Sequence, residues 1–296
     1  MPYTFKLNTE YRYDDLKTFK GKYLKEIESS IIVPEYIVNK DCREWNSELS
    51  RLLLEKIKTK PEKFLVKMND IMMEFVVTLD DKNMHLLSYQ EQSDSYKAAL
   101  SALEALGINA TPTVYQYTTE KPEYMINALA LGYGNNVNIF LSKVLFEDIL
   151  TSSSEKEFII GHELGHNQCN SAAREIVKKS ETFLMSRLNE YTADRAGLIA
   201  CKSLTGAVRA LLKLSDQNKS DDEWQKYAES VIDNIESMAA ECYADAGTHP
   251  CTERRIAALK LFWNSEKYAK LANQPNGNKN LLSDAELETE MEKLIS

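Results

Sequence analysis

One stretch decides how the rest of the sequence is interpreted: Gly161-His162-Glu163-Leu164-Gly165-His166, which follows three apolar residues. Its pattern is H-E-x-x-H. On a helix with 3.6 residues per turn, His162 and His166 lie one turn apart and project from the same face. Two neutral imidazoles at this spacing can occupy two tetrahedral positions around a zinc ion. Glu163 lies one position further round the helix, where it can accept a proton from a water molecule at the metal.

The motif is specific because histidine is scarce in this chain. Only four are present: His85, His162, His166 and His249. A chance H-E-x-x-H in such a chain has a probability on the order of 1% or less. The competing interpretation is a pair of hydrogen-bonded histidines on a half-buried helix, which the later motifs disfavour. His85 stands among apolar residues between predicted helices, so we interpret it as a packing or capping residue.

Length and composition indicate an ordinary globular protein. The chain has 296 residues, of which 43% are apolar and 27% charged, enough for a buried core. Its net charge of -9 disfavours nucleic acids and anionic membranes as general partners. No apolar run approaches the roughly 20 residues needed for an integral membrane span, and the N-terminus lacks a secretory pattern. The five cysteines contain no C-x-x-C pair, so we expect reduced thiols and a cytoplasmic location.

The predicted fold class is α+β and mostly helical. We divide the chain into a helical N-terminal region, a zinc metallopeptidase core, and a linker with a C-terminal helix; these cover residues 1–106, 107–272 and 273–296. In the N-terminal region, Asp41 is the predicted cap of one helix. Gly107 is the predicted C-terminal cap of another.

A small sheet is predicted just before the H-E-x-x-H helix. Residues 113–118 are β-branched and aromatic, and two further strands flank a Gly/Asn turn at 133–136, which is typical of a hairpin. An exposed edge strand can hold an extended peptide near a metal as an added strand. The alternative is a hairpin that only covers the helix. Ser154 and Glu157 form a capping-box pattern, so the H-E-x-x-H helix is expected to begin near Glu155.

The third metal ligand is expected beyond the motif. Glu190 and Asp194 are four residues apart on one face of a predicted helix. If Glu190 binds zinc, Asp194 can accept the other ring N–H of a ligand histidine and hold its orientation. The alternative is a solvated acidic face that pairs with Arg187 and Arg195.

The remaining histidine stands just before another predicted helix, which Thr252 is expected to cap. His249 could donate a hydrogen bond to a developing oxyanion, or it could approach the metal itself. Arg255 could pair with a carboxylate of the site or with substrate. A surface histidine and a solvated arginine are the alternatives for these two residues.

Four features in order, H-E-L-G-H, N-E-x-x-A-D, T-H-P and a downstream R-I, resemble the HtpX and CAAX prenyl protease family of gluzincin metallopeptidases. Asn127 and Ala128, followed by Gly132, are similar to that family's N-A-x-x-x-G edge strand. The resemblance covers about residues 110–265.

This resemblance implies a set of roles. The implied zinc ligands are His162, His166 and Glu190, and the implied catalytic base is Glu163. Asp194 matches the acid that supports a ligand histidine. The residues implied to act around the oxyanion and substrate are His249, Arg255, Asn127 and Ala128. Many members carry membrane spans and this chain has none, so we expect a soluble member and do not carry over prenylated or membrane-bound substrates.

The function expected from the sequence is a zinc metalloendopeptidase with one zinc ion per chain and protein or peptide substrates. A competing hypothesis is a zinc-stabilised peptide-binding or chaperone-like module. An intermediate case is a latent protease whose site is closed by His249 as a fourth ligand, with Cys251 as a weaker candidate for that position. The sequence does not predict the oligomeric state or the cleavage preference.

Overall fold

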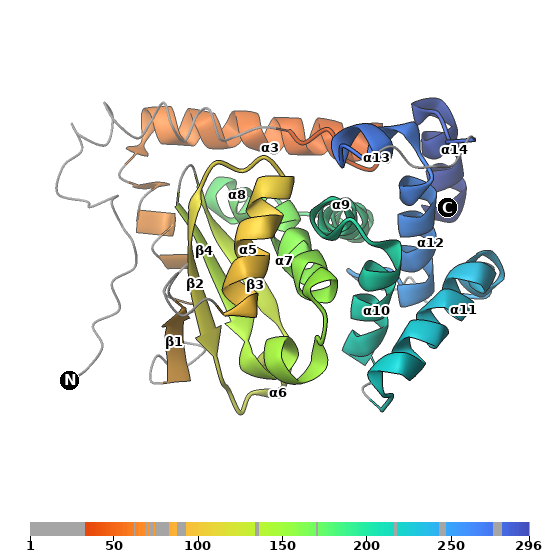
Figure 1. Ribbon diagram of the computed structural model, residues 1–296. Coiled ribbons are helices and arrows are strands. Elements are labelled where there is room, and N and C mark those ends of the chain that lie inside the picture. The colour runs from red at the N-terminus through yellow and green to blue at the C-terminus, as the bar shows by residue number, and fades with distance from the viewer. Residues whose placement is uncertain are drawn as a thin grey trace.

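The chain folds into a mixed sheet and a set of helices, shown in Figure 1 as a computed structural model. The described residues are 33–61, 63–64, 66–68, 70–71, 74, 83–87, 93–133, 136–169, 171–215, 218–242, 247–274 and 280–295. The strands are β1 (Met84–Leu87), β2 (Thr111–Tyr117), β3 (Ala128–Tyr133) and β4 (Asn136–Ser142). The helices up to the motif are α3 (Lys40–Thr59), α5 (Asp94–Ala105), α6 (Pro122–Met125), the π-helical η4 (Val144–Ile149) and α7 (Ser153–Gln168). The later helices are α8 (Ser171–Val177), α9 (Phe183–Cys201), α10 (Leu204–Ser215), α11 (Asp221–Ala240), α12 (Thr252–Trp263), α13 (Glu266–Leu271) and α14 (Asp284–Ile295). The predicted α+β, mostly helical fold class is confirmed.

The four strands lie in the order β1-β2-β4-β3, with β2 and β4 parallel and the other pairs antiparallel. The predicted hairpin is therefore present as β3 and β4, and β3 is an edge strand of the described sheet. One face of the sheet, with Val114 and Ile139, belongs to the main hydrophobic core. The opposite face carries a smaller aromatic cluster in which Tyr115 stacks on Phe140.

The open side of β3 follows from its register. The amide of Ser142 donates to the carbonyl of Asn127 at 3.1 Å, so Asn127 directs its backbone toward β4. Backbone groups alternate in an antiparallel pair, so Ala128, Ala130 and Gly132 direct theirs away from β4. The Gly132 amide is held there by the Asn167 side-chain oxygen of α7 at 3.2 Å. The edge strand predicted from sequence thus lies directly beside the H-E-x-x-H helix, and its residues Ala128 and Ala130 are buried.

Strand β1 was not predicted. It pairs with β2, where His85 lies opposite Gln116, and it forms the edge of the sheet farthest from β3. His85 is exposed on this strand. Helix α5, also from the first 106 residues, packs on β2 and α7. Residues 1–32 of the predicted N-terminal region lie outside the described residues, and the predicted division into three regions stays a prediction.

Helix α7 is the central element and lies between the sheet and α9 (Figure 1). It begins two residues earlier than predicted. Ser152 is the N-cap, and its hydroxyl accepts from the Glu155 amide at 3.3 Å while the Glu155 carboxylate accepts from the Ser152 amide at 3.1 Å. The predicted cap, Ser154 with Glu157, is wrong because Glu155 is the acid that has buried partners.

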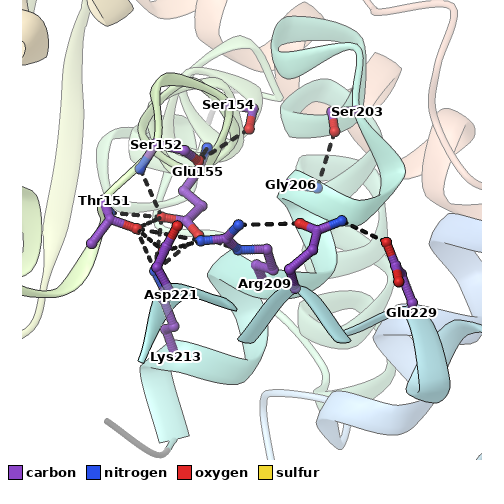
Figure 2. Close-up of polar contacts among 11 residues, drawn as sticks. Thr151, Ser152, Ser154, Glu155, Ser203, Gly206, Arg209, Lys213, Asp221 and Glu229 are labelled. Carbon is purple, nitrogen blue, oxygen red and sulfur yellow. Dashed lines mark hydrogen bonds and ion pairs between the residues drawn. The ribbon is translucent and has the colours of Figure 1, made fainter. Parts of the chain in front are cut away.

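Those partners form an ion cluster at the start of α7 (Figure 2). Glu155 is fully buried, and its carboxylate lies 2.7 Å from Arg209 Nε and 2.9 Å from Lys213 Nζ. The Thr151 amide donates to the same carboxylate at 2.7 Å. Asp221, at the surface end, pairs with Arg209 and lies 3.5 Å from Lys213. The cluster joins α7, α10 and α11 with balanced charge, as buried ionic groups require.

Two other predicted caps are displaced. The side chain of Asn39, not Asp41, accepts from the Cys42 amide and caps α3. Helix α12 begins at Thr252, so the cap position belongs to Cys251. Helix α14 is present as predicted, and it packs on α12 and buries Leu287 and Met291.

The cysteine prediction is wrong in one respect. Cys242 and Cys251 are joined in a disulfide, whereas Cys42, Cys169 and Cys201 are buried free thiols. The disulfide encloses the loop that carries His249. Disulfides are uncommon in reducing compartments, so this pair removes the support that the cysteines lent to a cytoplasmic location.

Candidate metal centre

The two motif histidines meet at the C-terminal half of α7. Their Nε2 atoms are 3.1 Å apart, and the rings stand edge to face with centroids 4.6 Å apart. His162 is buried and His166 is partly buried. The one-turn spacing therefore produces the convergence of ring nitrogens that the sequence predicts.

Helix α9 brings a carboxylate to the same point. Glu190 places Oε1 3.2 Å from His166 Nε2 and Oε2 3.6 Å from His162 Nε2. Four tetrahedral ligands at about 2.0–2.2 Å from zinc are separated by roughly 3.3–3.6 Å. The observed spacings of 3.1–3.6 Å are close to that range, and two histidines with a glutamate are a common donor set for catalytic zinc. These three residues thus fit a metal ion.

The close approach of α7 and α9 depends on a seam of small residues. A methyl group added at Gly161 would lie 2.5 Å from the Ala200 side chain, and one added at Gly165 would lie 2.8 Å from the Ala196 side chain. Both distances are shorter than van der Waals contact. Glycine at these two positions therefore lets Glu190 come within reach of the histidines.

A buried acid holds the first histidine in place. His162 Nδ1 lies 2.9 Å from Asp194 Oδ1, so the ring donates through Nδ1 and keeps the lone pair of Nε2 for the metal. Asp194 in turn accepts two hydrogen bonds from Arg255, at 2.8 Å and 2.6 Å. This bidentate pair fixes the carboxylate. Arg255 therefore contacts the site through Asp194 and also directly, with Nη2 3.7 Å from Glu190 Oε2.

His249 lies at the rim of the site. Its Nε2 is 3.4 Å from Glu190 Oε1, and its side chain is 67% exposed. Its Nδ1 lies 2.9 Å from the Thr248 hydroxyl. Arg187 of α9 donates to the Gly247 carbonyl at 3.2 Å and so ties this loop to the helix. The group of described residues that converges on the metal position contains His162, His166 and Glu190, with His249 outside it.

A second group of described residues with metal-binding atoms contains Cys242, Cys251 and Glu253. The two sulfur atoms of that group are bonded to each other. Cys251, considered from sequence as a closing ligand, is therefore occupied elsewhere.

The electrostatics of the site favour a cation. Burial raises the pKa of Glu163, and the neighbouring carboxylate of Glu190 adds to this. Burial also opposes ionisation of Glu190 and Asp194. The His166 side chain nevertheless holds the pKa of Glu190 below its usual range, and the Arg255 side chain does the same for the pKa of Asp194. Formally, three carboxylates face one guanidinium, which leaves two negative charges. A divalent ion would balance them.

The residues expected to bind substrate lie at the start of β3. The Asn127 side chain accepts from the Ala128 amide at 2.8 Å, and its carbonyl is held by β4 as described above. Two residues that sequence analysis did not single out support this strand. Asn167 binds Gly132, and the Tyr117 hydroxyl donates to the carbonyl of Tyr124 at 3.0 Å. Burial, and then the nearby Glu163 charge, raise the pKa of Tyr117. No local pattern in the sequence marks either residue.

Comparisons with known proteins agree with this geometry. The model of peptidase family M48 matches residues 90–183 and 180–262, more than half of the chain. No curated protein and no solved structure matches the chain significantly. Within the described residues, we find no helix that is long and apolar enough to cross a bilayer.

Proposed function

As a member of peptidase family M48 the chain is a zinc-dependent metallopeptidase, and we propose that it is an endopeptidase that cleaves extended segments of proteins or peptides. The observation that carries the proposal is the convergence of His162, His166 and Glu190 within 3.1–3.6 Å, with Glu163 beside them on α7. The endopeptidase assignment is supported by β3, an edge strand of the described sheet in which Ala130 directs its backbone groups away from β4. An extended chain can pair with such an edge without presenting either terminus.

Within the family, we place the chain in the branch that contains HtpX and the CAAX prenyl proteases. The support is the set of motifs around Glu190, Asp194, His249 and Arg255, which the structure brings to one site. The preferences of membrane-bound members for their substrates are not part of this proposal.

The proposed chemistry divides the work among the chain's own residues. Zinc held by His162, His166 and Glu190 would supply Lewis acidity, which lowers the pKa of water and polarises a peptide carbonyl. Glu163 accepts the proton of the attacking water and passes it to the leaving amine. Burial raises the pKa of its carboxyl group above the usual range.

The other residues orient the metal ligand His162 and the substrate, and they stabilise the oxyanion. Asp194, held by Arg255, keeps His162 in the tautomer that a metal requires. His249 donates to the oxyanion that forms on the substrate. Ala130 offers its backbone N–H and C=O to the peptide on the free side of β3.

The test is the Glu163→Gln variant. The amide keeps the size of the side chain but cannot accept the proton, so we expect kcat to fall by about 10²–10⁴-fold. Zinc per chain should stay at one, measured by mass spectrometry of metal content. Hydrolysis would be followed with a fluorescently labelled unfolded protein and with peptides blocked at both ends.

The matched control is Glu157→Gln, on the same helix and also partly buried. We expect this change to leave kcat near that of the original protein. Full activity in Glu163→Gln would overturn the mechanism. Cleavage only of peptides with a free terminus would overturn the endopeptidase assignment.

A further inference from the structure

Helix α9 carries one stripe of residues that leads into the metal centre. Phe183, Arg187, Glu190 and Asp194 are spaced by four, three and four residues, so they lie on one face of the helix. Glu190 and Asp194 are the two members that reach the histidines. Phe183 is thus on the same face as the third ligand, seven residues before it. At 1.5 Å per residue this is about 10.5 Å along the axis.

Phe183 is unusual in its exposure. It is 62% exposed, which is more than any other large apolar residue in the described part of the chain. Its neighbour Leu184 is 42% exposed. Single exposed apolar residues are normal, whereas adjacent ones that border a site often belong to it. Neither side chain adds much buried apolar surface to the core of the protein.

The position of this pair is well defined. Thr182 caps α9, and its hydroxyl accepts from the Met185 amide at 3.2 Å. Phe183 therefore begins the helix on a fixed backbone. One turn later, Arg187 links the same face to the Gly247 carbonyl beside His249. The apolar pair and the third metal ligand are consequently carried by the same helix.

The other side of the site is the open edge of β3. Helix α7 lies between β3 and α9 and packs against both (Figure 1). A peptide added to β3 would run over α7 and present alternate side chains to opposite sides.

We propose that Phe183, assisted by Leu184, is a specificity-determining residue that selects an apolar substrate side chain close to the scissile bond. This inference rests on the proposed function, because its occupant is the substrate peptide. The argument for that occupant is continuity: the exposed pair stands on the helix face that supplies the third metal ligand.

The experiment compares two sets of blocked peptides, which carry leucine or alanine at each of three positions on either side of the cleaved bond. In the original protein we expect kcat/KM to favour leucine at one such position. In Phe183→Ala this preference should shrink by about tenfold, as expected when an apolar contact with the substrate is lost. The control is Leu86→Ala, which removes another exposed apolar side chain, 51% exposed, from the opposite edge of the sheet. It should leave the preference unchanged.

A binding measurement tests this inference separately from the proposed catalytic function. Peptide affinity is measured in Glu163→Gln and in Glu163→Gln with Phe183→Ala, with circular dichroism to verify folding. Weaker binding of the leucine peptide in the double variant supports the inference even if hydrolysis is absent, in which case the proposed function alone fails. An unchanged preference and unchanged binding would overturn it. So would an effect confined to self-association or to vesicle binding, because the pair would then belong to a protein or membrane interface.

Discussion

The two ends of α7 handle buried charge in opposite ways. At its start, Glu155 is fully buried and meets Arg209 and Lys213 at 2.7 Å and 2.9 Å. With Asp221 at the surface, two negative charges face two positive ones (Figure 2). At the other end of the helix, three carboxylates face the single guanidinium of Arg255.

The difference in charge balance distinguishes a structural end of the helix from a metal-binding end. The start of the helix contains its own counter-charges, so the chain alone completes it. The metal centre formally lacks two positive charges, which a divalent ion would supply. A carboxylate such as Glu163 can act as a base only where it is not already neutralised by a fixed cation. In the proposed mechanism, the excess negative charge therefore serves the reaction.

The largest expected effect comes from removing the metal. A strong chelator should abolish hydrolysis and lower the melting temperature, because the carboxylates of the centre lose their counter-charge. A site saturated about a thousandfold above its dissociation constant contributes about 4 kcal/mol to stability. Calorimetry with and without chelator measures the shift, and added zinc should restore both properties. An identical melting temperature in both states would show that the centre does not need an ion.

Breaking the ion cluster at the start of α7 should lower the stability of the fold and leave the metal centre intact. Glu155→Ala leaves Arg209 and Lys213 buried without their acid, which costs about 3–5 kcal/mol. Urea denaturation measures this loss. Bound zinc per folded chain should not change.

The control is Glu229→Ala, which removes an exposed acid close to the same cluster (Figure 2). It should alter stability by no more than about 0.5 kcal/mol. Equal losses in Glu155→Ala and Glu229→Ala would mean that the buried cluster does not hold the start of α7.

A smaller effect is expected from His249→Ala. If His249 stabilises the oxyanion, kcat falls by about a hundredfold, the lower end for losing such a donor. Its 67% exposure places it at that lower end. His85→Ala, which removes another exposed histidine on β1, serves as the control. A rise in activity would instead identify His249 as a gate that keeps the site closed.

The smallest expected effect comes from the seam between α7 and α9. Gly165→Ala places a methyl group 2.8 Å from the Ala196 side chain and 2.9 Å from the Cα atom of Ala193. We expect a loss of about 1–2 kcal/mol in stability and about tenfold in zinc affinity, because Glu190 is pushed away from the histidines. A competitive zinc titration measures the second effect.

The matched control for the seam is Gly247→Ala, where the added methyl group meets no atom within 4 Å. It should change neither stability nor zinc affinity appreciably. If Gly165→Ala behaved in the same way, the spacing of the two helices would not govern the metal centre.

Much of the site could be predicted from the sequence because helical spacing encodes it. One turn separates His162 from His166, and another separates Glu190 from Asp194. Helix geometry then requires each pair to share a face, and the structure brings both pairs together. The catalytic roles assigned to these residues stay predictions until the variants are measured.

Other features depend on partners far along the chain. Ser152 with Glu155 and Ser154 with Glu157 show the same capping pattern, and the choice between them is made by Arg209, more than fifty residues later. Strand β1 is four residues long and is defined by its pairing with β2. The disulfide between Cys242 and Cys251 depends on their meeting in space, which cysteine spacing alone did not reveal.

The small-residue seam also limits how the sequence can drift. Most surface positions of a protein accept a new side chain at little cost. At Gly161, Gly165 and Gly197 even the smallest side chain would collide with the facing helix. We expect a lineage to exchange such a glycine without loss of stability or zinc affinity only together with a second, compensating change across the seam. We therefore expect this centre to change through paired substitutions in the helix interface as well as through its ligands.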